Sequence, residues 1–128
     1  MTPMSERRNL LKGLTAIVVV CASAGVGAAE LCGREVASLQ QLYSDLTRSP
    51  TVKPVLNDAN FVAFADEQAR IVWTFTKPAH PAAPAVVCRR PVQADGRIDV
   101  QMQVRCGGPK QACDSLVAAF QALPVRPQ

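Results

Sequence analysis

The chain has 128 residues, of which 48% are hydrophobic and 19% charged, and its formal net charge is +4 at pH 7. This length and composition fit one globular domain and argue against a multidomain protein. No block of basic residues follows the first 29 positions, which argues against a nucleic-acid-binding protein.

Residues 1–29 have the three parts of an export signal peptide. Basic side chains form a positive head, residues 14–20 are mostly apolar, and small residues lead to Ala29. The apolar run is too short to span a membrane. We therefore expect cleavage before Glu30 and a soluble product, residues 30–128, that is periplasmic or secreted and has no membrane span.

The sequence RRNLLK at residues 7–12 resembles a twin-arginine export signal. An ordinary secretory signal in which two arginines happen to be adjacent is the alternative. The twin-arginine route carries folded proteins, some of them with a cofactor already inserted, so this resemblance leaves open a function that involves a cofactor.

Four cysteines follow the signal: Cys32, Cys88, Cys106 and Cys113. An even number of cysteines in a short exported chain predicts two disulfides. Three pairings are possible. We favour Cys106–Cys113, which would close a tight corner, together with Cys32–Cys88, which would link the N-terminus to a sheet.

Apolar side chains recur at intervals of three and four residues between residues 30 and 48, which predicts a first helix. Prolines and asparagines then predict a loop over residues 51–60. Four strands are expected after it, at residues 61–65, 70–76, 85–92 and 97–105. The last strand has the clearest pattern, because Ile98 and every second residue to Val104 are apolar and the residues between are polar.

A second helix is predicted after Pro109, which suits a first helical position. Its expected buried stripe comprises Cys113, Leu116, Val117, Phe120 and Leu123. Because all strand connections can be short, we predict an antiparallel meander. The expected fold is a two-layer α+β domain over residues 30–128, in which both helices cover one face of a four-stranded sheet.

Residues 77–84 contain three prolines, which exclude a regular helix or a central strand and predict an extended loop. The only histidine of the chain, His80, lies in this loop. A candidate binding surface comprises Trp73, Lys77, His80, Arg89 and Arg90, because tryptophan and arginine are common at interfaces. The interpretation that we favour over it is that Trp73 and Phe75 fill the core and that the two arginines are solvated.

Two motifs, WTFTKPAHP at residues 73–81 and CGGPKQAC at residues 106–113, resemble a group of small exported proteobacterial proteins. The resemblance extends over about residues 32–123 and implies no activity, because none is assigned to that group.

No catalytic set, metal-ligand spacing or cofactor motif is present in the sequence, so we expect a protein that is not an enzyme and has no cofactor. The favoured hypothesis is a non-enzymatic binding, inhibitor or accessory module that acts on a protein or envelope component. One alternative is a metal-binding or hydrolytic protein that uses His80. Another is an accessory subunit that is exported together with a larger enzyme.

Overall fold

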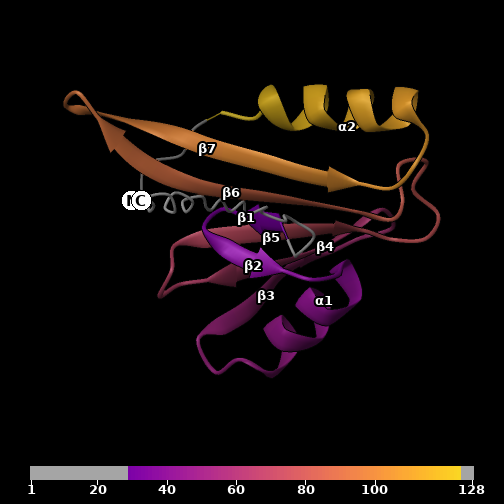
Figure 1. Cartoon of the computed structure of the whole chain (residues 1–128), viewed down its shortest axis with the longest axis horizontal. Coiled ribbons are helices and arrows are strands. Elements are labelled where there is room, and N and C mark those ends of the chain that lie inside the picture. Colours follow the sequence, from indigo (N-terminus) through magenta and orange to yellow (C-terminus); the bar gives the residue numbers. More distant parts are fainter. Residues whose placement is uncertain (1–28, 125–128) are drawn as a thin grey trace, which may run out of the picture.

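A computed structural model describes residues 29–124 and shows a five-stranded antiparallel sheet with a helix on each side (Figure 1). The strands lie in sequence order: β3 (Val52–Asn57), β4 (Phe61–Asp66), β5 (Ile71–Thr76), β6 (Ala85–Ala94) and β7 (Arg97–Cys106). The remaining elements are a hairpin of β1 (Ala29–Leu31) and β2 (Arg34–Val36), helix α1 (Leu39–Arg48) and helix α2 (Lys110–Gln121). The predicted α+β class and antiparallel meander are confirmed.

The fifth strand, β3, is the one that the sequence analysis assigned to a loop. Pro54 and the turn residues after it led to that error. The structure accommodates Pro54 because β3 is an edge strand, and its register with β4 shifts between Pro54 and Leu56. Edge strands tolerate proline and bulges, since one side of their backbone has no strand to pair with.

The prediction that both helices cover one face of the sheet is wrong. On β6, Val86 and Cys88 belong to the core on the α1 side, whereas Ala85 and Val87 belong to the core on the α2 side. Successive side chains of a strand point to opposite faces. The protein therefore has three layers, with α1 and α2 on opposite sides of the sheet (Figure 1). A strand that is buried on both faces has a continuous apolar sequence, as residues 85–88 do.

The core on the α1 side is the larger of the two and is centred on Trp73, which is 0% exposed. Leu42 and Leu46 of α1 pack into it. The ring of Tyr43 makes edge-to-face contacts with Phe64 and Phe75, at centroid distances of 5.3 and 5.1 Å. Such aromatic pairs add stability beyond the burial of their surface.

The hairpin of β1 and β2 covers the part of this sheet face that α1 leaves open. Arg105 of β7 donates hydrogen bonds from Nη1 to the carbonyl of Val36, at 2.9 Å, and from Nη2 to the carbonyl of Ala29, at 3.1 Å. The backbone N–H of Cys32 donates to the side-chain oxygen of Gln103. The hairpin therefore covers part of the polar side of β7. Gln103 and Arg105 remain hydrogen-bonded there, because backbone groups of the hairpin take the place of water.

The prediction that the first helix begins at residue 30 is wrong for residues 30–36, which belong to the hairpin of β1 and β2. Cys32 and Gly33 have positive φ angles of 49° and 83° and form the hairpin turn. The helix begins only after Ser38, whose side-chain oxygen accepts a hydrogen bond from the N–H of Gln41 at 3.0 Å. A serine in this position satisfies one of the free N–H groups at a helix start.

Both favoured disulfides are present in the structure. Cys32–Cys88 is in the core on the α1 side, where its cysteines are 1% and 0% exposed. Cys106–Cys113 joins the end of β7 to the first turns of α2 and is only partly buried. Leu116 and Phe120 of the predicted stripe on α2 are buried, but Leu123 lies beyond the end of the helix and is 45% exposed.

Candidate binding groove

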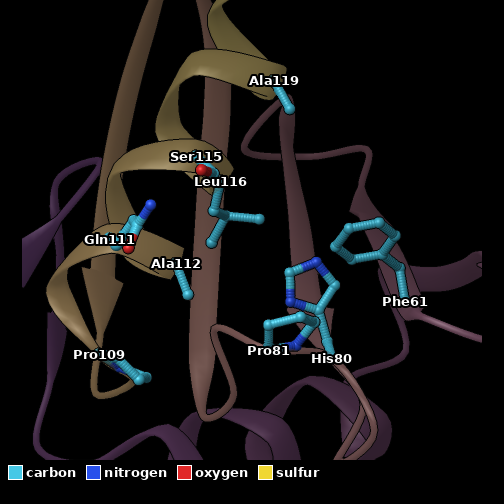
Figure 2. A pocket seen from close by; sticks show the side chains of 9 residues that line it. All are labelled: Phe61, His80, Pro81, Pro109, Gln111, Ala112, Ser115, Leu116 and Ala119. Carbon is cyan, nitrogen blue, oxygen red and sulfur yellow. The ribbon is translucent and has the colours of Figure 1, made fainter.

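A shallow groove of about 500 Å³ lies between α2 and the loop of residues 77–84. One wall is the side of α2, and the other is formed by the loop and by the first residue of β4 (Figure 2). Its lining is mostly apolar and consists of Phe61, His80, Pro81, Pro109, Gln111, Ala112, Ser115, Leu116 and Ala119. A volume of this order is typical of sites that accept a small molecule or a few side chains of a partner.

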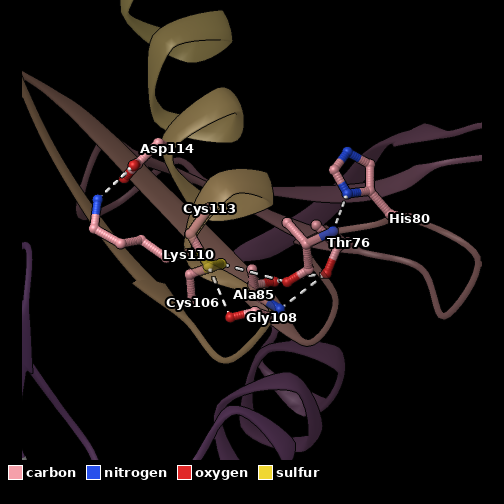
Figure 3. Close-up of a disulfide and its surroundings, with 9 residues drawn as sticks. Thr76, His80, Ala85, Cys106, Gly108, Lys110, Cys113 and Asp114 are labelled. Atoms are coloured by element: carbon pink, nitrogen blue, oxygen red, sulfur yellow. Dashed lines mark hydrogen bonds and ion pairs between the residues drawn. A yellow bond between two sulfur atoms is a disulfide. The ribbon is translucent and has the colours of Figure 1, made fainter.

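The loop that forms the wall is compact, whereas an extended course had been predicted. The N–H of His80 donates to the carbonyl of Lys77 at 2.9 Å, and the N–H of Ala83 donates to the carbonyl of His80 at 3.0 Å. At the base of the loop, the hydroxyl of Thr76 accepts from the N–H of Ala85 at 2.9 Å (Figure 3). Prolines restrict φ but do not prevent turns, so local hydrogen bonds determine the course of the loop.

The loop rests on the corner between β7 and α2. Ala82, at the contact, is 0% exposed, and the N–H of Gly107 donates to the carbonyl of Pro84 at 2.8 Å. A Cβ added to Gly108 would lie 2.6 Å from the carbonyl oxygen of Ala82. Gly108 is therefore required for this close approach of two backbone segments.

Replacing Gly108 by alanine should lower the free energy of unfolding by about 1–3 kcal/mol. The three atoms nearest to the new Cβ are backbone atoms of Ala82, which cannot move without a shift of the loop. Gly107→Ala is the matched control, since its nearest contact is a proline side-chain atom at 3.3 Å. Urea unfolding followed by tryptophan fluorescence measures both. A Gly108→Ala protein as stable as Gly107→Ala would contradict the close contact.

His80 is held in a defined orientation. Its Nδ1 accepts a hydrogen bond from the N–H of Ala82 at 3.0 Å, and its ring lies against Phe61 with a centroid distance of 5.0 Å. A neutral imidazole that accepts at Nδ1 carries its proton on Nε2. Figure 2 shows this second nitrogen directed along α2, between Leu116 and Phe61. The groove therefore presents the Nε2–H donor of His80 beside apolar side chains, in addition to the polar side chains of Gln111 and Ser115 on α2.

Phe61 is placed at the groove by the turn before β4. The carboxylate of Asp58 accepts hydrogen bonds from the N–H groups of Asn60 and Phe61, both at 2.9 Å. These backbone hydrogen bonds lower the pKa of Asp58 below its usual range. On its other side the ring of Phe61 contacts Phe120 of α2 edge to face, at 5.6 Å.

Only one of the five residues expected to form a binding surface lines this groove. Trp73 is fully buried in the core, so it belongs to no surface. Lys77 reaches the side chain of Asn57. Arg89 lies near the C-terminal end of α2, where its Nη2 is 3.5 Å from the carbonyl oxygen of Leu123. Arg90 lies on the α1 side, against Gly33. Arg89 and Arg90 diverge because neighbouring residues of a strand face opposite sides.

The residues of the groove that the sequence analysis missed come mainly from α2. Gln111, Ser115 and Ala119 recur every four residues and lie on one side of the helix. Such a row of small and polar residues resembles an ordinary solvated helix face. The sequence held no signal that the proline-rich loop would lie beside it.

Among residues 29–124, no group of three or more histidine, cysteine, aspartate or glutamate side chains is placed to hold a metal ion. Within the same residues, no helix is both long and apolar enough to cross a membrane.

Comparison of the chain with family models, with curated proteins and with solved structures gave no match. The fold and the groove therefore define the protein only as a disulfide-bonded α+β domain of three layers. The resemblance of its two motifs to small exported proteins stays a prediction.

Proposed function

We propose that this protein is an exported, non-enzymatic binding module that recognises a protein partner through the groove between α2 and the loop of residues 77–84. The observation that carries the proposal is the mostly apolar lining of the groove, in which Phe61 and Leu116 lie near the Nε2–H donor of His80. An apolar pocket with few polar groups is typical of a recognition site, in which the polar group fixes the orientation of the ligand.

The construction of the walls supports this function. The Cys106–Cys113 disulfide fixes the start of α2 to the end of β7, and the loop is closed at its base by Thr76 and Ala85 (Figure 3). A preformed groove loses less conformational entropy on binding than a flexible one. The two disulfides are also consistent with an oxidising compartment outside the cytoplasm.

Site-specific photo-crosslinking in the exporting cell tests the proposal. A benzoylphenylalanine at Ala119, which is exposed at the groove, should give a discrete protein adduct. The same probe at Gln40, which is exposed on α1 at the other side of the sheet, should give none.

A groove-filling substitution makes the test specific. Ser115→Trp should reduce the Ala119 adduct at least about tenfold, which corresponds to a loss of about 1.4 kcal/mol of binding. Ala118→Trp, on the same helix but outside the lining, should leave it unchanged. No adduct, equal adducts from both probe positions, or an adduct insensitive to Ser115→Trp would overturn the proposal.

The other hypotheses drawn from the sequence remain open to direct test. Elemental analysis of the exported protein tests a metal site at His80, and native mass spectrometry tests an accessory subunit in a larger complex. A stoichiometric metal that is lost in His80→Ala would favour the first of these over a binding module.

A further inference from the structure

The hydrogen bond between His80 and Ala82 joins a titratable side chain to a fully buried backbone group. Ala82 is 0% exposed, and its N–H donates to Nδ1 of His80 at 3.0 Å. A buried N–H that loses its partner costs about 1–3 kcal/mol. The imidazole therefore stabilises the position of Ala82 as long as Nδ1 can accept.

Ala82 is also the residue through which the loop contacts the rest of the protein. Its carbonyl group packs against Gly108, and its oxygen lies 3.4 Å from Sγ of Cys106. It belongs to the core on the α2 side, together with Leu116 and Phe120. Movement of Ala82 away from this corner would displace His80 and Pro81, and with them one wall of the groove.

Protonation removes the acceptor on which this arrangement depends. Histidine gains its second proton between about pH 8 and pH 5, and the imidazolium ion has two donors and no acceptor. In the closed loop, an N–H at Nδ1 would then face the N–H of Ala82. The hydrogen bond that holds Ala82 is therefore available only while the imidazole is neutral.

The charged groups around His80 do not offset this effect. On the loop, Lys77 contacts Asn57, and before β4, Asp58 is bonded to the backbone of its own turn. On α2, Lys110 and Asp114 pair with each other at 2.7 Å and point away from His80 (Figure 3). In the described part of the chain, none of these groups is hydrogen-bonded or ion-paired to the imidazole, so no carboxylate compensates an imidazolium in the closed loop.

We propose that His80 acts as a proton-sensitive latch: the neutral imidazole holds the loop of residues 77–84 against the β7–α2 corner, and acidification releases Ala82 and opens the groove. That this opening regulates partner binding rests on the proposed function. The latch itself depends only on the contacts of His80 and Ala82.

Amide hydrogen exchange on the full exported protein, with both disulfides intact, tests the latch. The protection factor of the Ala82 amide, corrected for the intrinsic exchange rate, should fall about tenfold or more between pH 7.5 and pH 5.0, because release is linked to the uptake of one proton. The amide of Val86, which is 0% exposed in the middle of the sheet, should keep its protection. A parallel fall at both amides would indicate global acid unfolding and would overturn the latch.

Two substitutions separate the titration from the hydrogen bond. In His80→Asn the side-chain oxygen takes a position close to that of Nδ1 and accepts without titrating, so Ala82 should stay protected at both pH values within about twofold. In His80→Ala the acceptor is absent, so protection of Ala82 should be low at both. An unchanged protection factor in the wild type, or the same pH-dependent loss in His80→Asn, would overturn the proposal.

The latch and the binding function can fail separately. A pH-dependent Ala82 amide without any adduct at Ala119 would support the latch and contradict the proposed function. An Ala119 adduct of constant yield, together with an Ala82 amide whose protection does not change with pH, would support the function and contradict the latch.

Discussion

Replacement of Trp73 by alanine is expected to lower the free energy of unfolding by about 3–5 kcal/mol. The side chain is 0% exposed and belongs to the core cluster on the α1 side that also holds Phe64 and Cys88. Alanine would leave a cavity that the disulfide-bonded walls cannot close. Since domains of this size are stable by only about 5–15 kcal/mol, the variant should be at the limit of folding.

A second substitution keeps this prediction testable if the alanine variant does not fold. Nε1 of Trp73 is buried and finds no acceptor among residues 29–124. Trp73→Phe removes this unpaired donor along with part of the ring, so it should cost only about 1–2 kcal/mol. Urea unfolding must be followed by circular dichroism, because Trp73 is the only tryptophan.

The control for both variants is Val72→Ala, on the same strand but on the opposite face and 39% exposed. It should change the free energy of unfolding by less than about 1 kcal/mol. Equal losses for Trp73→Ala and Val72→Ala would contradict the position of Trp73 in the core.

Removal of the Cys32–Cys88 disulfide, as Cys32→Ala with Cys88→Ala, should lower the free energy of unfolding by about 4 kcal/mol. The bond closes a sequence separation of 56 residues and therefore strongly restricts the unfolded chain. The equivalent removal of Cys106–Cys113, with a separation of seven residues, should cost about 2.5 kcal/mol.

Burial adds a second difference between the two bonds. Cys32 and Cys88 are 1% and 0% exposed, so a thiol reagent should reduce Cys106–Cys113 first in the native protein. Mass spectrometry after alkylation measures the order, and chemical denaturation measures the two losses. Four free thiols in the untreated exported protein, or a larger loss on removal of Cys106–Cys113, would contradict these assignments.

The parts of the fold that could be predicted from the sequence are those in which local pattern and tertiary environment agree. Met102 and Val104 alternate with polar residues on β7 and do pack on the α2 side, and Leu116 and Phe120 of α2 are buried. Of the three possible disulfide pairings, the favoured one is confirmed, with a short link at the corner before α2 and a long link from the N-terminal hairpin to the sheet.

The errors arose where tertiary contacts outweigh local signals. Pro54 suggested a loop, yet the edge of the sheet accepts it in β3. The helical spacing that begins at residue 36 extended the first helix too far back, because the turn at Cys32 and Gly33 and the cap at Ser38 were not recognised. The face of the sheet that each helix covers was also missed, although the unbroken apolar run at residues 85–88 indicated burial on both sides.

The candidate site was less predictable than the fold. His80 was singled out as the only histidine, and it does line the groove. Its neighbours there are Phe61 from β4 and Leu116 from α2, which are 19 residues before and 36 residues after it in the sequence and share no motif with it. Proximity of this kind is created by the three-layer packing and leaves no local pattern in the chain.

One short segment of β6 supplies side chains to the interior on both sides of the sheet, with Val86 and Cys88 directed to α1 and Ala85 and Val87 to α2. Neither half of the molecule is thus complete as an isolated fragment, since each would expose a bare apolar strand surface. Although the helices never meet, the protein should therefore melt in a single cooperative transition, and damage on one side should weaken the other through this shared strand.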